Sequence, residues 1–226
     1  MATSTIYTTF EALVGRGDES VIVIKLMMAF NDFALANEGL AIFKAKYAEK
    51  RTDKNRGAQM YFVRLQASHL DEAMKIVDAI ASHERLRYVV ARCSESARSA
   101  FDRLLTLRSD KTQKKKFEKF VGRIRNKVTF HYDESGKLVR RAMDRRAKNT
   151  QGNLTSITRG TEPYSWRFKA GDDVIDSIVC REIWKIPEDT DLQIAADAAA
   201  DYGHTIFMDF AEFASDLVTR YVRDGI

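Results

Sequence analysis

Apolar residues follow one another closely between Asp18 and about Lys50, and their pattern predicts one long helix. Asp18 is a suitable N-cap residue for its first turn. The apolar positions wrap most of the helix circumference; they are Val21, Ile24, Leu26, Met27, Met28, Phe30, Phe33 and Leu35. A helix that is apolar on most sides is either buried on several sides or contributes to a contact between subunits.

Further apolar residues at spacings of three and four predict a series of helices along the rest of the chain. The predicted segments are about 57–82, 84–94, 95–107, one that begins at 109–112, then 137–148, 174–183 and 188–223. Polar residues predict a connection at 51–56, a turn at 133–136 and a loop or weak hairpin at 149–162. Alternating side chains at 164–168 predict a short strand.

Composition supports a helical protein. The chain has 226 residues and only two prolines, Pro163 and Pro187, so long helices are uninterrupted over the first 162 residues. We expect an all-α fold, an antiparallel helical bundle with a C-terminal helical extension. The expected domains are a bundle over 1–148, and a loop with C-terminal helices over 149–226 that pack on it.

Several classes of protein are excluded by what the sequence lacks. No apolar run reaches the length of a membrane span, the N-terminus does not resemble a secretory signal, and two cysteines are too few for a disulfide framework. We therefore expect a cytoplasmic protein without membrane contact. Phosphate-binding glycine loops, dinucleotide fingerprints, zinc-ligand spacings and nucleophile elbows are all missing, so no cofactor and no metal is expected.

Charge is distributed unevenly along the chain. Residues 111–148 hold 14 Lys or Arg against 4 Asp or Glu, a balance of +10, whereas residues 171–226 hold 4 against 13, a balance of −9. One interpretation is internal complementarity, in which the acidic segment lies near the basic one. The other is a surface that attracts phosphates. The two interpretations are compatible.

The most informative segment is 123–133, within the basic part of the chain. It contains a guanidinium at Arg125, an amide at Asn126 and an imidazole at His131. An imidazole can exchange a proton with a ribose hydroxyl or a leaving oxygen near neutral pH, and a guanidinium can stabilise a phosphate. On one straight helix the two groups would not face the same point, so the chemistry requires a bend or a helix end between them. The alternative is a core histidine at a helix end with Arg125 on the solvated surface.

Arg125-Asn126, four intervening residues and His131 resemble the signature of the HEPN superfamily. Its members are helical bundles with this motif late in the core, and the segment from Arg64 to Glu72 also resembles the family. The resemblance covers residues 18–148 and leaves 149–226 unassigned. It implies a metal-independent endoribonuclease of toxin–antitoxin, phage-defence or RNA-processing type, in which Arg125 and His131 are catalytic and Asn126 positions them.

The same resemblance implies partners. Family members typically form homodimers in which two copies of the motif share one active-site cleft, and toxins among them are silenced by an antitoxin or another regulatory partner. In those silenced by nucleotidyl transfer, a tyrosine stands two residues after the histidine. Here that position is Asp133, and Tyr132 follows His131 directly, so silencing by tyrosine modification is not expected.

Other residues are assigned supporting roles. Glu72 would orient Arg125 from a neighbouring helix, with His69 close to it; a locally hydrogen-bonded, buried His69 is the alternative. Basic side chains would hold RNA phosphates, and Tyr132 would stack on a base. The basic set is Lys114, Lys115, Lys127, Arg140 and Arg141, and Lys116, Arg145 and Arg146 could join it. For the run from Lys114 to Lys116 the alternative is an ordinary solvated helix face.

Three functional hypotheses remain open from the sequence. The first is the HEPN-type endoribonuclease that cleaves RNA by attack of the 2′-hydroxyl. The second is a non-catalytic HEPN-like module that binds RNA or a protein. The third is a structural helical protein whose basic stripe docks on its own acidic C-terminal segment.

Overall fold

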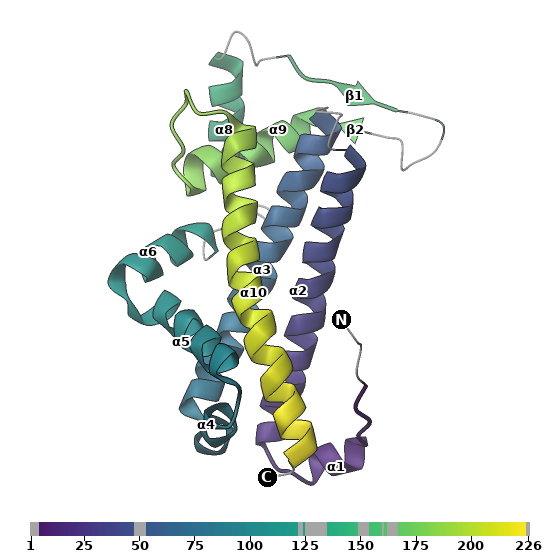
Figure 1. Cartoon of the computed structure of the whole chain (residues 1–226). Coiled ribbons are helices and arrows are strands. Elements are labelled where there is room, and N and C mark those ends of the chain that lie inside the picture. Colours follow the sequence, from purple (N-terminus) through teal and green to yellow (C-terminus); the bar gives the residue numbers. More distant parts are fainter. Residues whose placement is uncertain are drawn as a thin grey trace. The chain divides into compact units, whose positions relative to one another are not determined.

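The computed structural model describes residues 5–47, 53–121, 124, 135–148, 154–159, 161 and 167–224 (Figure 1). Within these residues the protein is all-α, as predicted. The helices are α1 (Phe10–Val14), α2 (Glu19–Tyr47), α3 (Asp53–Ser82), α4 (Glu84–Ala91), α5 (Glu95–Ser109), α6 (Lys111–Phe120), α8 (Lys137–Lys148), α9 (Lys169–Ser177), the π-helix η3 (Ile178–Ile183) and α10 (Leu192–Asp224). Two short strands, β1 (Ile157–Thr158) and β2 (Arg167–Phe168), pair antiparallel.

Most predicted helices are confirmed within a few residues of their ends. The prediction for 137–148 coincides with α8, and those for 18–50 and 188–223 correspond to α2 and α10. Three details differ. The short helix α1 was not expected, and α3 begins at Asp53, inside the segment 51–56 that is predicted as a connection. The segment predicted as one helix over 174–183 is an α-helix that continues as a π-helix from Ile178.

The chain divides into two compact units, described separately below. Unit 1 takes in Met1–Leu35, His69–Lys115 and His204–Ile226; unit 2 takes in Ala36–Ser68 and Lys116–Gly203. The division at residue 148 stays a prediction, because residues 149–153 lie outside the described part of the chain.

The core of unit 1 is aromatic. Phe33 of α2 meets Phe207 of α10 edge to face at 4.8 Å between ring centres, and Phe101 of α5 lies 4.6 Å from Phe213 of α10. Ser94 caps α5 by accepting a hydrogen bond from the Ala97 amide at 3.2 Å. These contacts join the first part of α2, α5 and the end of α10 into one core.

Unit 2 is held by close helix approach and a second aromatic group. Gly39 of α2 faces the ring of Phe62 on α3, and a Cβ at Gly39 would lie 2.7 Å from that ring, so a larger residue there would force the ring to move. The ring of Phe120 stacks on Trp184 at 6.0 Å and meets Tyr202 edge to face at 5.2 Å. Helix α8 packs against α9 and η3 and buries Leu138 and Ala142. This packing fixes the position of the basic helix α8.

A search of the described residues finds no helix that combines the length and the apolar character needed to cross a lipid bilayer.

Candidate nucleic-acid interface

The predicted motif lies outside the described part of the chain. Residues 122–123 and 125–134 are not described, so Arg125, Asn126, Lys127, His131 and Tyr132 have no described position. The flanking chain is described. Ile124 is buried, and the chain continues from Ser135 into α8. The arrangement of the motif therefore stays a prediction.

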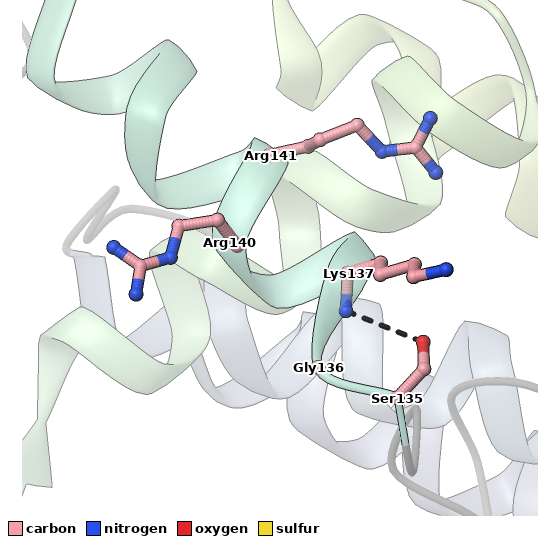
Figure 2. A pocket seen from close by; sticks show the side chains of 5 residues that line it. All are labelled: Ser135, Gly136, Lys137, Arg140 and Arg141. Carbon is pink, nitrogen blue, oxygen red and sulfur yellow. Dashed lines mark hydrogen bonds between the residues drawn. The ribbon is translucent and has the colours of Figure 1, made fainter.

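An open pocket lies where the chain enters α8. It has a volume of about 700 Å³, and its described lining residues are Ser135, Gly136, Lys137, Arg140 and Arg141 (Figure 2). Two of these, Arg140 and Arg141, belong to the set predicted to bind RNA, and the structure brings them together with Lys137. Figure 2 shows Lys137 and Arg141 extending toward the same side of the helix, one turn apart, and Arg140 extending away from them.

The local backbone explains why a helix begins here. Gly136 has a φ of 65°, a left-handed conformation that glycine adopts without strain. The Oγ of Ser135 accepts a hydrogen bond from the Lys137 amide at 3.3 Å and so satisfies one of the free donors of the first turn (Figure 2). The first turn of α8 contains no acidic residue. The positive end of the helix dipole therefore adds to the charge of Lys137, Arg140 and Arg141.

The far end of α8 has a different electrostatic environment. The guanidinium of Arg145 lies 2.6 Å from Glu182 and 3.0 Å from Glu188, and that of Arg146 lies 3.2 Å from Asp173. Glu182 and Asp173 are nearly buried in these pairs. The acidic segment does neutralise part of the basic one, as the first interpretation of the charge pattern expected.

Glu182 stays ionised in this environment. Burial by itself would raise the pKa of its carboxyl group, but the hydrogen bond and charge of Arg145, helped by Arg141 and Lys185, hold the pKa below its ordinary value. The guanidinium of Arg141 lies farther from Glu182, at 3.7 Å, and its side chain is 60% exposed. Arg141 therefore shares a carboxylate with Arg145 and still faces the pocket.

The cations at the pocket end are available to a ligand. Among the residues that the structure describes, neither Lys137 nor Arg140 has an acidic partner, and both are exposed. Lys137 and Arg141 extend to one side of the pocket, and together with the helix N-terminus and the Ser135 hydroxyl they suit a phosphate group; Arg140 adds positive charge on the other side. Its described lining contains no group that titrates near neutral pH, so these residues can bind an anion but cannot exchange its protons.

The other predicted residues are described individually. Lys114 and Lys115 lie on the exposed side of α6. Glu72 of α3 is exposed and forms an ion pair with Lys75 at 3.0 Å, within the same helix. His69 is partly buried; burial lowers its pKa, and the nearby charge of Asp32 opposes that shift. Whether Glu72 or His69 supports Arg125 stays a prediction, because Arg125 is outside the described residues.

The sequence-based prediction did not include Lys137 among the residues of the pocket or Glu182 as the acid that neutralises Arg145. A signal for Lys137 was present, since Ser-Gly before a basic helix combines a capping hydroxyl with a left-handed glycine. No local signal marks Glu182, which is 37 residues from Arg145. Within the described residues, no three His, Cys, Asp or Glu side chains lie close enough together to hold a metal ion.

No family model, no curated protein and no solved structure matches this chain.

Proposed function

We propose that this protein binds RNA through the pocket at the start of α8 and cleaves it without a metal ion, as an endoribonuclease of HEPN type. The observation that supports the proposal most directly is the pocket itself, which collects three cations beginning six residues after His131 in the chain. The motif supplies the reactive groups and the pocket supplies phosphate affinity.

Binding rests on Lys137, Arg140 and Arg141. Phosphate contacts by such side chains release counterions from the nucleic acid, so the affinity falls steeply with salt. Unpaired RNA is the expected substrate, because the single strand can bend to bring one phosphate to the pocket and the next to the motif. Lys114, Lys115 and Lys127 would extend the binding surface, and Tyr132 would stack on a base.

Cleavage would follow the chemistry of the three motif residues. His131 accepts the proton of a ribose 2′-hydroxyl, and the 2′-oxygen attacks the adjacent phosphorus. The bond from phosphorus to the 5′-oxygen breaks, and that oxygen takes a proton from the imidazolium or from water. Arg125 stabilises the negative charge on the phosphorus centre, and Asn126 positions these groups. The products are a cyclic 2′,3′-phosphate end and a free 5′-hydroxyl end.

The resemblance to the HEPN superfamily adds four further parts to the proposal. The chain would fold as an antiparallel helical bundle and form a homodimer that combines two motifs in one cleft. It would act as a toxin or in phage defence, and a partner such as an antitoxin would regulate it. The position of Tyr132 makes modification of that tyrosine an unsuitable way to silence the enzyme.

The direct test is RNA cleavage by purified protein in EDTA. We expect the wild type to cleave unstructured RNA and leave cyclic phosphate ends, and His131→Ala to cleave at least 100-fold more slowly at equal helicity by circular dichroism. The control is Lys148→Ala at the far end of α8, which should cleave like the wild type. Equal cleavage by wild type and His131→Ala would rule out the motif as the site of reaction.

A non-catalytic RNA-binding module is the second candidate. The observation that favours it is the described pocket lining, which can hold a phosphate but contains no acid–base group near neutrality. This candidate predicts salt-sensitive RNA binding without cleavage of any RNA offered. The cleavage assay, repeated with a binding measurement on the same RNA, separates the two functions.

A further inference from the structure

The two carboxylate oxygens of Glu182 face different cations. Oε1 lies 2.6 Å from the guanidinium of Arg145, which is the length of a direct hydrogen bond from a charged donor. Oε2 lies 3.7 Å from the guanidinium of Arg141 and 4.0 Å from the ammonium of Lys185, which is beyond hydrogen-bond length. The second oxygen therefore attracts two cations without accepting a hydrogen bond from either.

Arg141 and Lys185 are close to each other and accessible to a ligand. Their charged nitrogens both lie within 4.0 Å of the same oxygen, so one phosphate group could accept a hydrogen bond from each. The two side chains are 60% and 62% exposed. Arg141 lines the pocket at the start of α8 (Figure 2), and both residues belong to unit 2.

We propose that a phosphate of the bound RNA lies between Arg141 and Lys185, and that Glu182 competes with this phosphate for the two cations. The proposal rests on the proposed RNA binding at the pocket. It adds Lys185 as a binding residue and Glu182 as the residue that limits the affinity. The pocket therefore binds RNA less tightly than its cations alone would allow.

Arg145 makes this exchange possible. Breaking a buried ion pair is costly when it leaves a charge without a partner. Glu182 has a side chain that is only 9% exposed, but it keeps Arg145 at 2.6 Å when Arg141 turns toward a phosphate. A loose ion pair to an exposed arginine contributes little, whereas a phosphate can accept two hydrogen bonds from the same guanidinium. The exchange therefore favours the phosphate and leaves the carboxylate paired.

The backbone at Lys185 does not favour a lysine. Its φ is 57°, the one positive value at a non-glycine residue in the described part of the chain. A left-handed residue just after a helix is usually glycine, because other side chains are strained in this conformation. The Lys185 side chain can therefore be removed while the fold gains stability, which makes binding and stability separable in a test.

Lys185→Gly is the first test. We expect this variant to unfold at a higher temperature than the wild type, since glycine adopts the left-handed conformation without strain. It should bind a short single-stranded RNA about 5-fold more weakly at low salt, because one phosphate contact is lost. Lys185→Arg keeps the charge and should bind like the wild type. Fluorescence anisotropy measures the affinity, and unchanged affinity in Lys185→Gly would overturn the role of Lys185.

Glu182→Gln tests the competition. It removes the competing charge, so the RNA affinity should rise about 5-fold at a temperature where circular dichroism shows the variant to be folded. Glu188→Gln is the matched control, because Glu188 pairs with Arg145 at 3.0 Å and is 67% exposed. It removes the same charge and should change the affinity less than about two-fold. Equal gains, or weaker binding by Glu182→Gln, would overturn the competition.

Inorganic phosphate separates this anion site from the RNA-binding function. If the wild type binds no RNA, the proposed function fails, but millimolar phosphate still probes the site through the unfolding temperature, against chloride at equal ionic strength. Phosphate stabilises proteins in general, so the differences between variants are decisive. We expect a larger shift for Glu182→Gln and a smaller one for Lys185→Gly than for the wild type. Equal shifts in all three proteins would overturn the site.

Discussion

The two ends of α8 carry the same kind of side chain in different surroundings. At the first end, Lys137 and Arg140 are exposed beside a pocket and have no acidic partner within the described residues. At the far end, Arg145 and Arg146 are tied to nearly buried carboxylates. Basic residues on one helix thus divide into a part that holds the fold together and a part that can bind a ligand. The position of the acidic side chains decides which basic residues form ion pairs within the protein and which stay exposed to a ligand.

This comparison changes how the charge pattern of the sequence is understood. The charge pattern is compatible with both internal complementarity and phosphate attraction, and α8 shows the first directly at Arg145 and Arg146. At the start of α8, Lys137 and Arg140 keep their charge without an acidic partner among the described residues and line the pocket. If the pocket is the binding site, nucleic-acid binding should depend more on these two residues than on Lys148 at the far end of the same helix.

The largest expected effect comes from removing the carboxylate that neutralises the far end. Glu182→Gln keeps the size of the side chain but leaves Arg145 without its partner at 2.6 Å. We expect the free energy of unfolding to fall by about 2 kcal/mol, because a charged hydrogen bond to a nearly buried carboxylate is lost while Arg145 is partly exposed. Urea unfolding measures this change.

Glu188→Gln is the matched control for that prediction. Glu188 also pairs with Arg145, at 3.0 Å, but its side chain is 67% exposed. Its loss should change the free energy of unfolding by less than about 0.5 kcal/mol, since exposed ion pairs contribute little. Equal effects of the two substitutions would mean that burial does not distinguish the carboxylates at this end of α8.

The same pair predicts an acid dependence. The folded protein lowers the pKa of Glu182, so the folded state binds this proton less readily than the unfolded state. The stabilisation is therefore fully present above the unfolded value, about 4.3, and is lost as the pH falls through the lower folded value. The stability difference between wild type and Glu182→Gln should shrink over that acidic interval. A difference that stays constant from neutral to acidic pH would contradict the assigned cause.

At the pocket end, the expected effect is on binding rather than stability. Replacing Lys137 and Arg140 together by alanine should weaken RNA binding about 10-fold at low salt and reduce the salt dependence by one to two ions. Lys148→Ala removes one charge at the opposite end of the helix and should change affinity less than about two-fold. Fluorescence anisotropy with a short single-stranded RNA measures both. If the double variant and Lys148→Ala lose the same RNA affinity, the attraction comes from the total charge of the chain and not from the pocket.

How far the sequence predicts this region depends on the range of the interactions. The limits of α8 follow from local signals, namely a capping serine, a glycine and a periodic apolar pattern, and the prediction for 137–148 is confirmed. The change to a π-helix at Ile178 was not predicted. A π-helix has a wider turn than an α-helix, and the spacing of apolar residues in a segment of six residues does not distinguish the two.

The residues next to an arginine in the sequence also do not show whether a distant part of the chain engages its guanidinium. Arg181 shows this well, because its guanidinium hydrogen-bonds the backbone carbonyls of residues 186–188 and 190 and so holds the chain after η3. In the sequence it resembles Arg140, which lines the pocket and has no acidic partner among the described residues. Charge alone predicts Arg140, Arg141, Arg145 and Arg146 as phosphate contacts without distinguishing them. In the structure, tertiary contacts with acidic side chains engage Arg145 and Arg146 instead. The motif at Arg125 and His131 stays a prediction from resemblance.

The smallest predicted effect concerns the backbone that shapes the pocket. Gly136 has a φ of 65° and no neighbour within 4 Å of an added Cβ, so Gly136→Ala should cost about 1 kcal/mol of stability through backbone strain alone. Gly171 within α9 is also free of neighbours, but its φ is not in the left-handed region, so Gly171→Ala should stabilise the protein by about 0.5–1 kcal/mol. Thermal unfolding of the two variants should therefore shift in opposite directions. If both shifts have the same sign, the turn into α8 does not require its left-handed residue, and the pocket end would owe its shape to the packing of Leu138 and Ala142 instead.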